Sequence, residues 1–62
     1  MTKDQIQHEM KVRIEMVRVA AECALWEIEH GNFSQILLEH LEEMKMYSER
    51  ARLDWDASYL VA

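Results

Sequence analysis

A carboxylate and an imidazole stand three residues apart near the middle of the chain, at Glu27 and His30. On a helix this spacing places both side chains on one face, as in the carboxylate-bridged metal centres of helical bundles. With His40 they form a candidate ligand set, Glu27, His30 and His40. The same stretch also holds Gly31, the chain's single glycine, and glycine commonly closes a helix. We therefore expect a corner between two helices and no cofactor, with a metal-binding carboxylate and histidine bundle as the alternative function.

The other residues capable of covalent chemistry show no catalytic grouping. Cys23 lies in an apolar row, which predicts an inert buried thiol. Ser34 is placed where a helix cap is expected. Two helices alone offer no evident substrate pocket. The sequence therefore favours a protein that is not an enzyme.

Negative charge is concentrated around the predicted corner. The net charge is −5, and residues 21–45 contain six glutamates against one lysine. Acids and bases balance in the rest of the chain, which argues against a general binder of nucleic acid backbones. The pattern predicts an acidic patch for an unknown, basic protein partner, formed by Glu27, Glu29, Glu39, Glu42 and Glu43.

Two long helices must position these groups. The 62 residues contain no proline and are rich in strong helix formers. Thr2 and Gln5 have the spacing of a capping box at a helix start, and Asn32 or Ser34 can cap a second helix. The prediction is an all-α, antiparallel two-helix hairpin in one domain over 1–62, with a helix over about 3–30, a turn over 31–33 and a helix over about 34–59.

An apolar row with alternating spacings of three and four residues runs along each predicted helix. The first row is Ile6, Met10, Ile14, Val17, Ala21, Ala24 and Ile28, and the second is Phe33, Leu37, Leu41, Met44, Ser48, Ala51, Trp55 and Tyr59. Heptad-like spacing of this kind is typical of long helices that pack at a shallow angle. We expect these two rows to face each other inside the hairpin.

A further apolar row on the first helix has no partner within such a hairpin. It consists of Val12, Met16, Val19, Cys23 and Trp26. Soluble monomers seldom expose a patch of this size, and a second copy is the simplest cover. The sequence therefore predicts a homodimeric four-helix bundle with coiled-coil packing, and a tetramer is a further option. The architecture resembles that of the plasmid copy-number RNA-binding hairpins, but none of that family's functional motifs can be matched here.

These features favour a small acidic regulator or adaptor that acts through protein–protein interaction. No apolar run approaches the roughly 20 residues that cross a bilayer, and the first residues lack the apolar core of a signal peptide. One cysteine cannot form an intrachain disulfide. We expect a reducing, cytoplasmic setting, with neither membrane nor nucleic acid among the partners.

Overall fold

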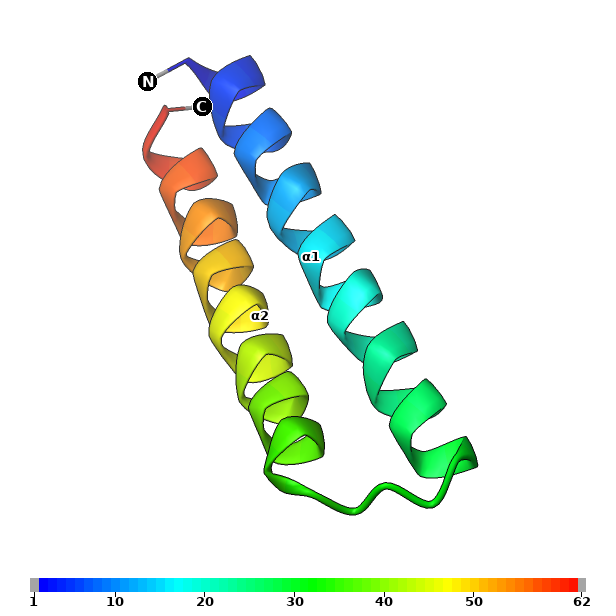
Figure 1. Ribbon diagram of the computed structural model, residues 1–62. Coiled ribbons are helices and arrows are strands. Elements are labelled where there is room, and N and C mark those ends of the chain that lie inside the picture. Colours follow the sequence, from blue (N-terminus) through cyan, green and yellow to red (C-terminus); the bar gives the residue numbers. More distant parts are fainter. Residues whose placement is uncertain (1, 62) are drawn as a thin grey trace.

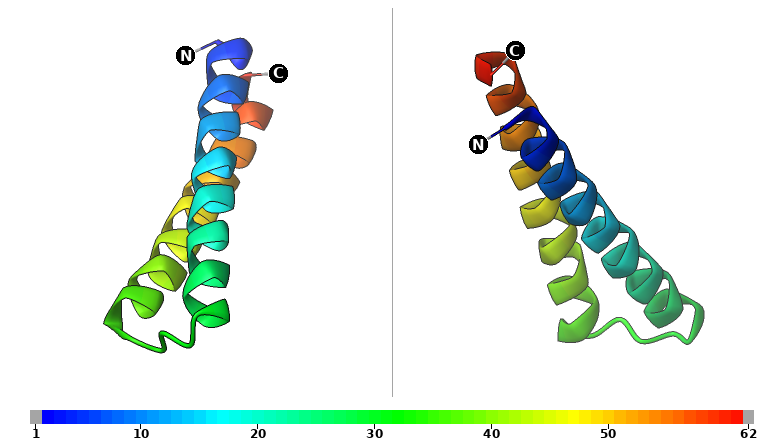
Figure 2. Two further views of the ribbon diagram at one scale, coloured as in Figure 1. Left: turned by 45° about the vertical axis from the view of Figure 1, so that its right-hand side comes forward. Right: turned by 90° about the horizontal axis from the view of Figure 1, so that it is seen from above.

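The protein is a hairpin of two long helices (Figure 1). The computed structural model describes residues 2–61, with side chains as far as Leu60. Helix α1 spans Lys3–Glu29 and helix α2 spans Gln35–Val61. They lie side by side and run in opposite directions, so the start of α1 and the end of α2 lie at the same end of the hairpin (Figure 2). The predicted all-α hairpin is confirmed. It is a rod of about 46 × 13 × 11 Å.

The capping box at the start of α1 is present as the sequence predicts. The Gln5 backbone N–H donates to Thr2 Oγ1 at 3.2 Å, and the Thr2 N–H donates to Gln5 Oε1 at 2.8 Å. Two N–H groups that have no partner within the helix are satisfied in this way. Local sequence therefore fixes where α1 begins.

Gly31 closes α1 and turns the chain toward α2. Its φ of 72° is a left-handed conformation that glycine adopts without steric conflict. The Gly31 N–H donates to the Ile28 carbonyl at 3.0 Å, and the Asn32 N–H donates to the Glu27 carbonyl at 2.8 Å. This pair of bonds is the Schellman motif of helix ends. The predicted corner is confirmed.

Two alanines are among the few hydrophobic residues that are buried between the helices. Within residues 2–60, the buried hydrophobic residues are Ile6, Ala20 and Ala24 on α1 and Leu37 on α2. Alanine at the contact allows two helix axes to approach closely. The core is thin, because buried alanines remove little apolar surface from water.

An ion pair links the middle of α1 to the second half of α2. Arg13 Nη1 donates to both carboxylate oxygens of Asp54 at 2.6 Å and to the Arg50 carbonyl at 3.3 Å. The Asp54 side chain is only 12% exposed, and that of Arg13 is 31% exposed. The sequence analysis did not identify this pair, which joins positions 41 residues apart.

The predicted packing of the two apolar rows is confirmed for Ile6, Ala24 and Leu37, which are buried, and is wrong for several other large members. Ile14, Ile28, Leu41, Trp55 and Tyr59 were expected between the helices, but each is at least 45% exposed. On α1 the contact follows Ile6 and Ala24 of the first row together with Ala20, which lies beside that row. Other large members of the row, such as Ile14 and Ile28, are therefore left on a flank of the hairpin.

Candidate functional site

The first candidate surface is an apolar face shared by both helices. We call it the two-helix face and define it as Ile14, Leu25, Ile28, Leu41, Trp55 and Tyr59. At about 100° per residue, each helix places its members to the same rotational side of the buried contact line. Because the helices are antiparallel, those members come to the same side of the hairpin. The face therefore contains residues of both α1 and α2.

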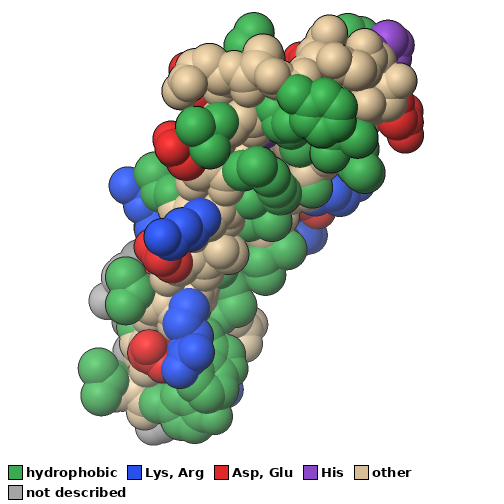
Figure 3. All heavy atoms as spheres, turned by 90° about the horizontal axis from the view of Figure 1, so that it is seen from below, with side chains coloured by type: hydrophobic (Ala, Val, Ile, Leu, Met, Phe, Trp, Pro, Cys, Tyr) green, Lys and Arg blue, Asp and Glu red, His purple; other side chains and the backbone are tan. Residues whose placement is uncertain are grey.

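Figure 3 shows hydrophobic side chains gathered in a band along the hairpin, with Lys and Arg side chains at its margins. On the α2 side of the two-helix face, Trp55 and Tyr59 form an edge-to-face pair with centroids 4.7 Å apart, and Arg52 lies 5.6 Å from the Trp55 ring. Helical spacing places Lys11 and Arg18 along the α1 margin. The margins of this face therefore carry positive as well as negative charge.

The second candidate surface is the row Val12, Met16, Val19, Cys23 and Trp26, which we call the α1 strip. All five side chains are exposed in the hairpin. The sequence correctly grouped them on one face of α1, but the predicted burial of Cys23 is not found in the single hairpin. Their assignment as a dimer interface stays a prediction.

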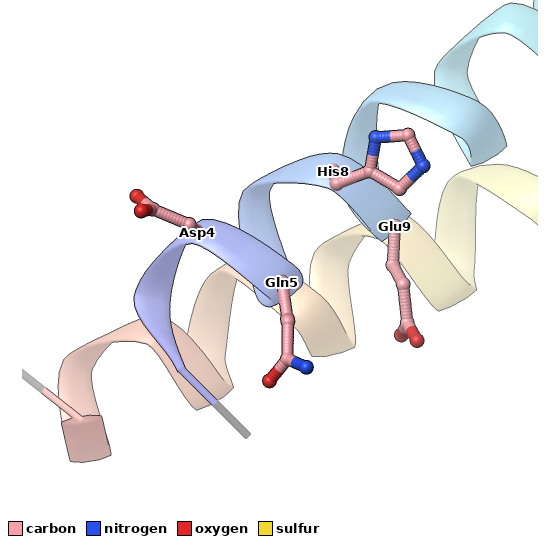
Figure 4. A pocket seen from close by; sticks show the side chains of 4 residues that line it. All are labelled: Asp4, Gln5, His8 and Glu9. Carbon is pink, nitrogen blue, oxygen red and sulfur yellow. The ribbon is translucent and has the colours of Figure 1, made fainter.

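Two shallow hollows mark the ends of the α1 strip. At the amino-terminal end, Asp4, Gln5, His8 and Glu9 line a hollow, and Figure 4 shows Gln5 and Glu9 projecting to the same side while Asp4 points away. At the other end, the second hollow is lined by Glu22, Cys23, Trp26, Glu27 and His40. Each hollow therefore combines a surface depression with two carboxylates.

The acidic residues near the corner are divided between two surfaces. Glu39, Glu42 and Glu43 line one depression on α2 together with Met46. Glu27 instead lies at the end of the α1 strip with Glu22, and Glu29 is exposed in the last turn of α1. The predicted patch of Glu27, Glu29, Glu39, Glu42 and Glu43 is thus not one depression, and its role in partner binding stays a prediction.

The alternative metal ligands are only partly brought together. Glu27 and His40 line the same hollow. His30 instead stacks on Trp26 with ring centroids 3.9 Å apart, and its Nδ1 lies 2.8 Å from the Trp26 carbonyl oxygen. Within residues 2–61, no three His, Cys, Asp or Glu side chains are grouped so as to hold a metal ion. A single hairpin therefore does not assemble the ligand set Glu27, His30 and His40.

His40 carries a feature that sequence reasoning missed. Its Nδ1 is buried without a hydrogen-bond partner among the described residues. Buried polar atoms are nearly always paired, so this nitrogen is an unusual feature of the hollow. No signal in the sequence distinguishes this histidine from a solvated one.

Neither described helix is long and apolar enough to cross a membrane. Comparison with protein-family models, with curated proteins and with solved structures finds no match to this chain. The functional assignment therefore depends on the geometry of the exposed faces.

Proposed function

We propose that this protein is a non-enzymatic interaction module: a hairpin that pairs with a second copy as a four-helix bundle and presents an acidic surface to a protein partner. One observation carries the proposal. Large hydrophobic side chains are exposed along both flanks of the hairpin, while its buried hydrophobic residues within 2–60 are Ile6, Ala20, Ala24 and Leu37.

The thin core supports self-association on energetic grounds. Chains of about 60 residues bury only about 60% of the surface that the unfolded chain exposes. Oligomerisation is one of the common ways in which such small folds gain the missing stability. Two of the four buried hydrophobic residues here are alanines. A second copy would supply the large apolar contacts that the single hairpin lacks.

We place the second copy on the two-helix face. Its six side chains are each at least 45% exposed, so each offers on the order of 100 Å². Two copies would bury about 1,200 Å² between them, which reaches the range of stable interfaces. A face that spans both helices also gives the packing of a four-helix bundle, in which each helix contacts two others.

Matched substitutions on the two faces test this arrangement. Leu41 belongs to the two-helix face and Val19 to the α1 strip, and the two side chains are equally exposed, at 46% each. Leu41→Glu should bring the mass in solution from twice the 7.4 kDa chain mass down to a single chain, because it would bury an unpaired charge. Val19→Glu should leave the dimer intact.

Light scattering gives the mass, and circular dichroism reports helix content for each variant. Loss of helix together with a single-chain mass in Leu41→Glu also supports the proposal, since the hairpin core is thin. Dissociation by Val19→Glu but not by Leu41→Glu would move the contact to the α1 strip, as the sequence predicted. A wild type with the mass of one chain would overturn self-association.

A further inference from the structure

We infer that the α1 strip is a docking surface for a basic amphipathic helix of another protein. This rests on the proposed bundle, because a dimer formed through the two-helix face leaves the α1 strip uncovered. The strip exposes Val12, Met16, Val19, Cys23 and Trp26 in one row, and it runs between two hollows. The chemistry of its margins identifies the kind of occupant.

Carboxylates lie along both margins of the α1 strip. At about 100° per residue, Glu15 and Glu22 border one side of the row, and Glu9 and Glu27 border the other. Glu15 is paired with Arg18, and Glu9 lies 3.8 Å from Arg13. In the described part of the chain, neither Glu22 nor Glu27 lies within ion-pair distance of a base. The uncompensated negative charge is therefore greatest at the hollow near Trp26.

These margins disfavour a second copy of the chain as the occupant. In an antiparallel crossing centred on Val19, Glu15 of each copy would lie opposite Glu22 of the other. In a parallel crossing, Glu22 would approach Glu27 of the other copy. Like charges at these flanking positions of paired helices oppose association. Lysines or arginines at the same flanking positions of a partner helix would instead form ion pairs with Glu22 and Glu27.

The length of the strip sets the size of the partner segment. From Val12 to Trp26 the row rises about 21 Å at 1.5 Å per residue, which matches a helix of roughly 14 residues. Apolar side chains every three or four residues on that helix would pack along the row, as in other complexes that seat a helix in a groove. The occupant is thus a short basic helix with one apolar face.

The test uses a fluorescein-labelled synthetic peptide of about 16 residues with leucines on one face and lysines beside them. A second peptide has the same leucines with glutamate in place of lysine. Fluorescence anisotropy with the full-length protein should show binding of the lysine peptide that weakens as salt increases. Binding of the glutamate peptide should be at least about tenfold weaker.

A charge-matched pair of variants localises the binding. The double variant Glu22→Gln with Glu27→Gln should weaken binding of the lysine peptide by about fivefold or more. The control, Glu49→Gln with Asp56→Asn, changes the net charge equally on a different surface and should change the affinity by less than about twofold. Val19→Ser should also weaken binding, whereas Leu53→Ser, on the outer side of α2, should not.

Equal losses in both double variants, or equal affinity for both peptides, would overturn the inference. The mass in solution, measured on the same samples, separates this outcome from failure of the proposed bundle. A dimer that binds neither peptide would refute the docking surface but not the bundle. A monomer that binds the lysine peptide through Glu22 and Glu27 would refute the bundle but not the docking surface.

Discussion

At the scale of single residues, the Arg13–Asp54 pair is the most specific contact between the helices. Two bonds of 2.6 Å to a carboxylate that is 12% exposed hold α1 and α2 in one register. Charge-assisted hydrogen bonds of this type are about twice as strong as neutral ones. Since this contact is directional and needs both partners at the same level, we assign part of the choice of register to this pair.

A double-mutant cycle with Arg13→Ala and Asp54→Ala should give a coupling of about 1–3 kcal/mol in the free energy of unfolding. The control is the pair Arg52 and Asp56, whose atoms are 3.5 Å apart on side chains that are 72% and 52% exposed. Its coupling should stay below about 0.5 kcal/mol. Urea unfolding at fixed protein concentration measures both cycles, and equal couplings would show that Arg13–Asp54 has no special role.

At the scale of elements, the hairpin depends on the left-handed conformation of Gly31. A Cβ added at this glycine would meet no heavy atom within 4 Å, so a substitution changes the backbone energy and not the packing. Gly31→Ala should lower the free energy of unfolding by roughly 1 kcal/mol. Gly31→Asn should lose less, because asparagine tolerates this conformation better. A neutral or stabilising Gly31→Ala would contradict the assigned corner.

The elements themselves were predictable from local signals. The Thr2 and Gln5 box, the glycine at 31 and the helix-forming composition act within a few residues of one another, so the sequence carries them directly. The rotation of each helix toward its neighbour was not predictable, because α1 is apolar on two sides. Only the packed structure shows that the contact follows one edge of the first apolar row, with Ala20 buried beside Ile6 and Ala24.

The candidate site was also predictable only in part. The α1 strip lies on one helix, so its spacing alone groups its members. The acidic patch draws on both helices, and a rotation that the sequence does not specify divides it between two surfaces. The Arg13–Asp54 pair joins positions that are 41 residues apart. Each partner also has residues of opposite charge close to it in sequence, so the sequence does not single out this pairing.

At the scale of the whole molecule, the protein is a thin rod with more large apolar side chains outside than between its helices. Ile6 and Leu37 are the large hydrophobic residues that it buries within 2–60, whereas Trp26, Trp55 and Tyr59 remain exposed. The proposed bundle through the two-helix face would cover the apolar side chains on one side and would leave the acid-bordered α1 strip for a partner. The two sides of one hairpin thus have different proposed occupants.

The central claim is that a second copy covers the two-helix face. The most direct test is an isotope-filtered nuclear Overhauser experiment on a dimer mixed from labelled and unlabelled chains, which detects proton contacts between copies alone. We predict contacts between chains from Ile14, Leu41 and Trp55. Contacts between chains from Val12, Met16 and Val19, with none from Leu41 or Trp55, would contradict the account.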